Sequence, residues 1–191
     1  NEESGYISFA ATERNLTVVP DVIYQPEDEN ARDILTLSDA KNFLYILNYE
    51  NYTESGIEAL LQDIGNTNYD LVVMDAFYAD NKQFSKEQIE SLKTKKNGGK
   101  RLVISYMSIG EAEDYRWYWH EEWKKTATRP LWLEKENPDW AGNYKVKYWD
   151  PAWQKIIYSG DDSYLKKILD AGFDGVYLDI IDAFEYFESK P

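Results

Sequence analysis

The sequence predicts an α/β fold of parallel strands, of the β/α-barrel type, with acidic side chains at one end of the sheet. Three apolar runs each finish on a carboxylate, at residues 71–75, 102–111 and 175–179. In a β/α barrel the loops that follow the strands open on one face and carry the active site. Stretches with a helical apolar stripe separate the runs, a pattern typical of parallel strands joined by right-handed crossovers. We therefore expect an enzyme that works through carboxylates.

The chain has 191 residues, enough for one domain but short of the roughly 250 residues of a complete TIM-type barrel. Residues 1–40 have a weak, polar pattern, which we interpret as an N-terminal extension with one short strand at 16–19. Residues 41–191 are expected to form the N-terminal portion of a barrel, with about four to five strand–helix units. The apolar run 43–47 predicts the first buried strand.

The helices between these strands have their own signals. Apolar residues at i, i+3, i+4 and i+7 form one core-facing stripe, at Ile57, Leu60, Leu61 and Ile64. In the next helix Ser85 is the predicted N-cap, and Gln88 completes a capping box. Gly98 and Gly99 are expected to stop this helix before the strand at 102–108.

Between residues 109 and 143 the alternation of strands and helices stops. This insertion is far longer than the about two to six residues of an ordinary βα loop. Aromatic faces can pack on the flat C–H faces of sugar rings, so we expect one or two tryptophans here to contact a ligand. In the alternative interpretation the tryptophans form a small satellite core that holds the loop rigid. All seven lie inside the insertion or just beyond it: Trp117, Trp119, Trp123, Trp132, Trp140, Trp149 and Trp153.

The region after the insertion predicts a return to strand and helix. Residues 144–149 alternate in side-chain character and form either another barrel strand or a short edge strand in the loop. Asp150 is expected to cap a helix that has Pro151 at its first position. The final strand, 176–178, ends on Asp179.

Composition excludes several kinds of site. There is no cysteine and one histidine, His120, so thiol nucleophiles, disulfides and multi-histidine or thiolate zinc sites are excluded. We expect neither a metal nor a cofactor. The net charge of −14 argues against nucleic-acid binding, which requires a basic surface. No apolar stretch approaches the roughly 20 residues of a membrane span, and none has the residue order of a signal peptide.

Four sequence blocks occur in a specific order, at residues 105–116, 136–144, 148–151 and 172–179, and include Ser-Tyr-Met-Ser-Ile-Gly-Glu-Ala-Glu and Gly-Phe-Asp-Gly-Val-Tyr-Leu-Asp. Together they resemble the endo-α-1,4-polygalactosaminidase family, glycoside hydrolase family 114. The similarity covers about residues 43–190 of the chain.

The resemblance implies a TIM-type barrel that hydrolyses α-1,4-linked, galactosamine-containing polysaccharide. The strand-end aspartate of the last block, here Asp179, would be a catalytic carboxylate. The family's second catalytic carboxylate is a glutamate on a later strand, past Pro191. We therefore expect an incomplete barrel, completed by a missing C-terminal half or by a second chain, or altered in this protein.

The resemblance also implies a secreted or extracytoplasmic location. The chain begins at Asn1 rather than Met, so we expect that processing or trimming has removed an N-terminal segment that included a signal peptide.

Several other polar and aromatic residues are candidates for substrate binding. Each candidate carboxylate has a structural alternative: Asp75 would cap the loop that follows its strand. Glu111 or Glu113 would pair with Arg116. Asp182 would cap the next helix or orient the catalytic aspartate. The predicted substrate-binding residues are Asp75, Tyr106, Glu111, Glu113, Trp117 and Asp182.

The expected function is a glycosidase with paired-carboxylate acid/base chemistry. Asp179 would act as nucleophile or electrostatic partner, and a glutamate outside this sequence would act as general acid/base. The negative net charge fits a polysaccharide partner that is a cationic amino-sugar polymer. The alternatives are a non-catalytic carbohydrate-binding protein on the same scaffold and a barrel hydrolase of another glycan.

Overall fold

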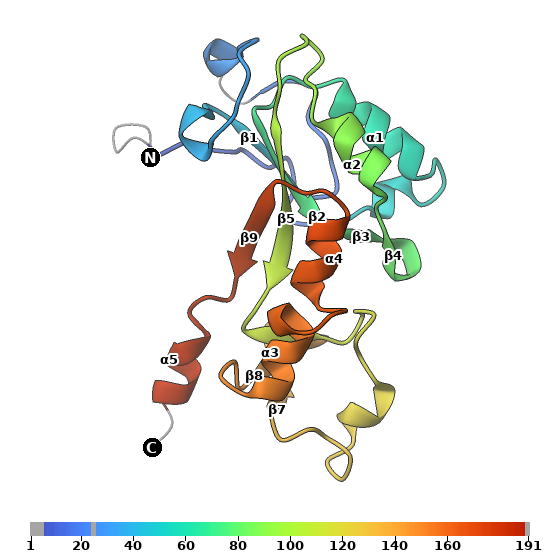
Figure 1. Cartoon of the computed structure of the whole chain (residues 1–191), viewed down its shortest axis with the longest axis vertical. Coiled ribbons are helices and arrows are strands. Elements are labelled where there is room, and N and C mark those ends of the chain that lie inside the picture. Colours follow the sequence, from blue (N-terminus) through green and yellow to red (C-terminus); the bar gives the residue numbers. More distant parts are fainter. Residues whose placement is uncertain (1–5, 24–25, 190–191) are drawn as a thin grey trace. The chain divides into compact units, whose positions relative to one another are not determined.

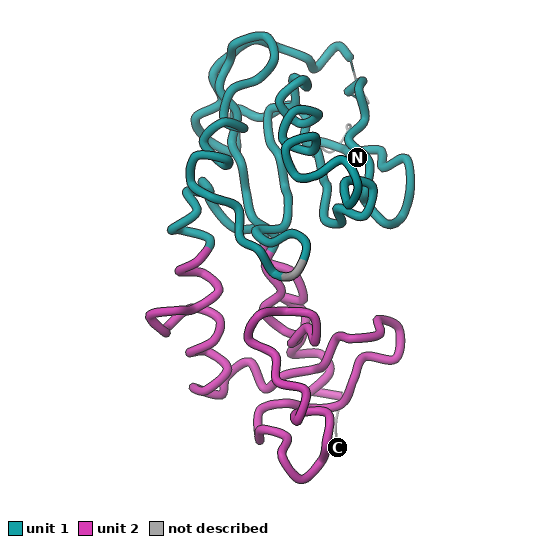
Figure 2. Tube along the Cα trace, turned by 90° about the vertical axis from the view of Figure 1, so that its right-hand side faces the viewer, with its two compact units in different colours: residues 1–106, 168–177 teal, residues 107–167, 178–191 magenta. Residues whose placement is uncertain are grey.

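The computed structural model describes residues 6–23 and 26–189 and divides into two compact units (Figure 2). Unit 1 consists of residues 1–106 and 168–177, and unit 2 of residues 107–167 and 178–191. The described residues before position 40 belong to unit 1, and a domain boundary at that position stays a prediction.

The main sheet has four strands in the order β1, β2, β5, β9 (Figure 1). Strand β1 pairs with β2, and β2 with β5, in parallel. All four strands lie where the apolar runs predict them. Strand β2 is buried at all five positions, as expected for a parallel strand covered on both faces. The bounds are β1 (Phe43–Ile46), β2 (Leu71–Asp75), β5 (Leu102–Ser108) and β9 (Gly175–Asp179).

The sheet curves about one face. Tyr45 lies on β1 and Tyr177 on β9, the two outer strands, yet their ring centroids are 5.5 Å apart. Neighbouring strands lie about 4.8 Å apart, so three spacings of a flat sheet would separate these strands by about 14 Å. The Tyr106 ring of β5 stacks on Tyr177 at 6.5 Å. The rings meet across a concave face of the sheet, which we call the concave wall, and this curvature confirms the barrel-type α/β class. Within the described residues the sheet remains open at β1 and β9.

Two helices of unit 1, α1 (Ile57–Gly65) and α2 (Lys86–Leu92), pack against each other. The capping box of α2 is present: the Gln88 N–H donates to Ser85 Oγ at 3.2 Å, and the Ser85 N–H donates to Gln88 Oε1 at 2.9 Å. The predicted stop at Gly98 is too late. The helix ends at Leu92 because the chain folds back there, and the Lys93 carbonyl accepts the N–H of Arg101. The predicted stripe of α1 is confirmed by the burial of Leu60, Leu61 and Ile64.

The N-terminal segment forms no strand at 16–19, so that prediction is wrong. Leu16 has a φ of 55°, and a residue in this left-handed region interrupts the extended backbone that a strand requires. Its carbonyl instead accepts the N–H groups of Leu47 and Asn48, at 3.1 and 3.3 Å. The segment is therefore joined to the end of β1 by loop hydrogen bonds.

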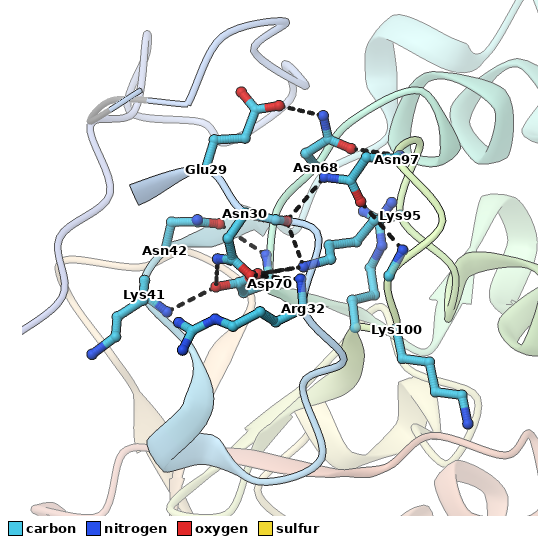
Figure 3. Close-up of polar contacts among 12 residues, drawn as sticks. Glu29, Asn30, Arg32, Lys41, Asn42, Asn68, Asp70, Lys95, Asn97 and Lys100 are labelled. Atoms are coloured by element: carbon cyan, nitrogen blue, oxygen red, sulfur yellow. Dashed lines mark hydrogen bonds and ion pairs between the residues drawn. The ribbon is translucent and has the colours of Figure 1, made fainter. Parts of the chain in front are cut away.

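A buried polar network joins the N-terminal segment to the start of β2 (Figure 3). The Asp70 carboxylate is fully buried and accepts from Lys95 Nζ at 2.8 Å, from Asn30 Nδ2 at 3.0 Å and from the Lys41 N–H at 2.9 Å. The Asp70 N–H donates to Asn42 Oδ1 at 2.8 Å. A buried charge is tolerated where it is paired and hydrogen-bonded, and Lys95 meets both conditions for Asp70.

Unit 2 contains an antiparallel sheet in the order β6, β8, β7. Strand β8 is the middle strand of this sheet, so both predicted forms of residues 144–149, a barrel strand and an edge strand in the loop, are wrong. The Asp150 carboxylate accepts the Ala152 N–H at 2.8 Å, and Pro151 opens the helix as predicted. The bounds are β6 (Glu111–Glu113), β7 (Leu133–Glu136), β8 (Asn143–Val146), α3 (Pro151–Gln154), the π-turn η7 (Lys155–Ser159), α4 (Tyr164–Asp170) and α5 (Ala183–Glu188).

The shorter elements complete the described chain. The hairpin β3 (Phe77–Tyr78) and β4 (Lys82–Gln83) follows β2. In the described part of the chain, no helix has the length and apolar character that a membrane crossing requires. The 3-10 turns are η2 (Pro26–Asp28), η3 (Leu37–Asp39), η4 (Glu50–Tyr52), η5 (Ala79–Asn81) and η6 (Glu121–Lys124).

Candidate active site

Asp179 is the last residue of β9, so the structure places this carboxylate at the strand end that the sequence predicts. Its side chain is half-buried. Its backbone carbonyl accepts the N–H of Ile109, the residue that follows β5, at 3.2 Å. The backbone of Asp179 is therefore held by the neighbouring chain segment of unit 2.

Glu111 begins β6 and is only 2 % exposed. Its carboxylate accepts from Lys145 Nζ at 2.5 Å and from Asn137 Nδ2 at 2.8 Å. Lys145 lies on β8 directly opposite Glu111 in the antiparallel ladder. A cross-strand ion pair of this kind fixes the orientation of the carboxylate.

Glu113 ends β6 and is 1 % exposed. Arg116 Nε and the Tyr115 hydroxyl each donate to its carboxylate at 2.6 Å. The Arg116 guanidinium also lies over the rings of Tyr115 and Tyr164, at 5.2 and 5.3 Å. The structure thus contains the ion pair with Arg116 that was the structural alternative for this glutamate.

Most tryptophans of unit 2 belong to one chain of packed rings, which we call the ring core. It corresponds to the satellite-core interpretation. Trp117 is a half-buried member, and Lys167 Nζ lies 4.4 Å from its ring centroid. Tyr144 is the last ring of the ring core, and burial raises its pKa. Successive centroid distances of 5.6, 5.8, 5.0, 5.2, 5.4 and 4.8 Å connect Trp117, Tyr118, Trp153, Trp132, Trp123, Trp119 and Tyr144.

A second aromatic group, the aromatic platform, consists of Tyr148, Trp149, Tyr186 and Phe187. The Trp149 ring lies 5.0 Å from Tyr148 and 4.6 Å from Phe187, and Tyr186 lies 4.9 Å from Phe187. Trp149 is 49 % exposed and Tyr148 is 41 % exposed. Lys145 Nζ lies 5.9 Å from the Tyr186 ring. Trp149 was one of the seven tryptophans considered from the sequence, whereas the other three rings were not named there, although Tyr148 lies in one of the four blocks.

In unit 1, Asp75 and Tyr106 are partners in the β2–β5 register. Asp75 is 7 % exposed, and its Oδ1 accepts the Phe77 N–H at 2.8 Å. This bond caps the loop after β2, as the structural alternative for Asp75 requires. Tyr106 is half-buried on the concave wall beside Tyr177.

Asp182 occupies the N-cap position of α5 without a capping hydrogen bond from its side chain. The side-chain cap that was one structural alternative for Asp182 is therefore not formed. Across residues 6–23 and 26–189, no group of three or more His, Asp or Glu side chains is arranged to hold a metal ion.

Among curated proteins, the chain is 45 % identical over 161 residues to an uncharacterized protein of Methanocaldococcus jannaschii, covering 83 % of this chain and 42 % of that protein. It is 39 % identical over 131 residues to an uncharacterized protein of Deinococcus radiodurans, covering 69 % and 39 %. The chain thus spans about two fifths of the length of these relatives.

Two solved structures are similar in part. One is Aspergillus fumigatus Ega3 in complex with galactosamine, with 24 % identity, a TM-score of 0.44, and coverage of 62 % of this chain and 39 % of Ega3. Another is the glycoside hydrolase domain of PelA from Pseudomonas aeruginosa, with 16 % identity, a TM-score of 0.46, and coverage of 75 % and 45 %. The model of glycoside-hydrolase family GH114 matches residues 27–190, and the chain belongs to this family.

Proposed function

We propose that this chain carries part of the active site of a glycoside hydrolase that cleaves α-1,4-linked, galactosamine-containing polysaccharide, with Asp179 as a catalytic carboxylate. The observation that carries the proposal is the position of Asp179 as the last residue of β9 in a chain of family GH114. Active sites of β/α barrels are built from residues at the carboxyl ends of the strands. The family membership supports carbohydrate as the substrate class.

Glycosidases divide the chemistry between two carboxyl groups. Asp179, in the ionised form, would stabilise or attack the anomeric carbon as positive charge develops on the sugar. A glutamate outside this sequence would protonate the leaving oxygen and then activate water. A separation of about 5–5.5 Å between the two groups would favour retention, and about 6.5–9.5 Å would favour inversion.

For Glu111 and Glu113 we propose supporting roles. Each is buried and already bonded to a cation, Lys145 or Arg116. Substrate that displaced either cation would leave an uncompensated buried charge, which is strongly unfavourable. We therefore propose that Glu113 shapes the insertion and that Glu111 holds Lys145 beside the aromatic platform.

We propose that the sugar-contacting rings are Tyr148 and Trp149 of the aromatic platform in place of Trp117. A ring can pack on a sugar only where its face is accessible. Trp149 is roughly half exposed, whereas Trp117 is packed against Tyr118 and lies next to Lys167. Tyr106 remains a proposed contact on the concave wall of unit 1.

The net charge of −14 supports a cationic glycan, because a negative surface attracts the ammonium groups of deacetylated galactosamine. The proposal includes a location outside the cytoplasm. Cell fractionation with an antibody against the protein tests this part, and recovery in the cytoplasmic fraction alone would contradict it.

The decisive experiment compares wild type, Asp179→Asn and Asp161→Asn in the full-length protein. Asp161 is an exposed aspartate of unit 2 outside the candidate site and serves as the matched control. We expect wild type and Asp161→Asn to release reducing ends from galactosaminogalactan, and Asp179→Asn to bind it without turnover. Hydrolysis of neutral polysaccharides instead would indicate another glycan. Binding without turnover by wild type would indicate the carbohydrate-binding alternative.

A further inference from the structure

The residue after Asp179 has an unusual backbone conformation. Ile180 has a φ of 58°. Among the described residues, two other non-glycine residues have positive φ, Leu16 and Asn81, and neither is β-branched. A β-branched side chain is a genuine outlier in this region, because its Cβ substituents crowd the backbone. Such a conformation persists only where the surrounding structure determines it.

Gly110 provides the surface on which the Ile180 turn lies. A Cβ added to Gly110 would collide with the Ile180 carbonyl oxygen and would lie 2.7 Å from Ile180 Cγ2 and 2.6 Å from Ala183 Cβ. These approaches are shorter than van der Waals contact, and two of the three involve atoms that cannot rotate away. Position 110 must therefore remain without a side chain for the turn to keep this shape.

Hydrogen bonds hold the turn on both sides of the strained residue. The Asp179 carbonyl accepts the N–H of Ile109 at 3.2 Å, and the Ile180 carbonyl accepts the N–H of Ala183 at 3.3 Å. The second bond begins the first turn of α5. The backbone thus passes from strand to helix within three residues, with the Asp179 peptide held by the chain before Gly110.

We propose that Gly110 and Ile180 are positioning residues for Asp179: the strained turn packed on Gly110 fixes the backbone from which the catalytic carboxylate projects. With the backbone held, the carboxylate can be displaced only through its own side-chain torsions. Misplacement of a reacting group by about 1 Å lowers rates by about 100-fold, so such restraint affects turnover more than binding. This inference rests on the proposed catalytic role of Asp179.

The Ile180 side chain itself contributes to the positioning of Asp179. Glycine would adopt a φ of 58° with less strain, so a turn that served connection alone would be more stable with glycine at this position. Ile180 Cγ2, however, lies over Gly110 and fills the space that a Cβ there would occupy. In Ile180→Gly the backbone can still adopt this φ, but the side chain that packs on Gly110 is absent. This variant therefore distinguishes an effect on the position of Asp179 from an effect on folding.

The test measures kcat, KM and melting temperature for Ile180→Gly, Ile180→Val and Gly110→Ala in the full-length protein, on galactosaminogalactan. For Ile180→Gly we expect an equal or higher melting temperature, a kcat about tenfold lower and a KM within about twofold of wild type. Ile180→Val keeps a β-branched side chain against Gly110 and should retain most of the wild-type kcat. Gly110→Ala should lower both melting temperature and kcat. Ile181→Ala, at a neighbouring residue that is 68 % exposed, is the control and should match wild type.

The outcomes separate the two proposals. An active wild type with an unchanged kcat for Ile180→Gly would overturn the positioning role and leave the proposed function intact. An equal loss of kcat in Ile180→Val and Ile180→Gly would also overturn it, because a β-branched side chain at position 180 would then have no effect on turnover. A wild type without turnover on any glycan would refute the proposed function and the inference with it.

Discussion

Removal of the Lys95 ammonium tests the network at the start of β2. In Lys95→Met the Asp70 carboxylate would stay buried, with donors only from neutral amides. Lys95 Nζ donates to Asp70 Oδ1 at 2.8 Å and to the Asn30 carbonyl at 2.9 Å, and both charged side chains are inaccessible to solvent. Breaking a buried ion pair on one side lowers the free energy of unfolding by about 3–5 kcal/mol. This is a large part of the about 5–15 kcal/mol of a typical domain.

The assay is urea unfolding of wild type, Lys95→Met, Asp70→Asn and the double variant. Because the two side chains contact each other, the double variant should lose less free energy of unfolding than the sum of the single variants. Lys96→Met is the matched control, since Lys96 is an exposed neighbour and should change stability by no more than about 0.5 kcal/mol. A loss below about 1 kcal/mol for Lys95→Met, or additive losses, would refute the reasoning.

Three further predictions concern the platform, the insertion and alkaline stability. Trp149→Ala should raise KM for glycan about three- to tenfold, as the loss of one stacking contact implies, without lowering the melting temperature. Trp140→Ala, 55 % exposed and outside the platform, is its control, and equal effects would contradict the platform. Glu113→Gln removes the charge of the buried carboxylate that pairs with Arg116 and should lower the free energy of unfolding by about 3 kcal/mol in urea, whereas a change within about 0.5 kcal/mol would exclude a structural role. Burial raises the pKa of Tyr69 to about 12, so its contribution to stability is full below about pH 10 and decreases as pH rises to about 12, by at most about 1.4 kcal/mol per pH unit. Tyr69→Phe should flatten this decrease in pH-dependent unfolding, and identical slopes would show that another group causes it.

Elements determined by neighbouring residues could be predicted from the sequence. The capping box needs only Ser85 and Gln88, three positions apart, and both of its hydrogen bonds are present. The strand β5 has the predicted bounds because its residues are mostly apolar and Gly110 follows two positions after its end. The position of Asp179 follows from the same local pattern.

Interactions between distant segments could not be predicted in this way. Lys95 lies buried against Asp70, which is 25 positions earlier, and no local pattern around either residue indicates this pairing. The tryptophans show the same limit. Trp117 and Trp149 have the same side chain in similarly polar surroundings of the sequence, and their exposure depends on which rings pack against them in three dimensions.

The turn after Asp179 could not be predicted for a different reason. Local preference opposes a left-handed isoleucine, so the sequence at Ile180 favours continued extension of β9. Consistency between local preference and tertiary structure is the rule in natural proteins, and departures from it concentrate at functional sites. The departure at Ile180 adjoins the one carboxylate that the strand pattern and the family resemblance both select. The contact with Gly110 and the hydrogen bond from Ile109 hold Ile180 in this conformation against its local preference. The kcat values of the Ile180 variants measure whether this conformation is needed for turnover.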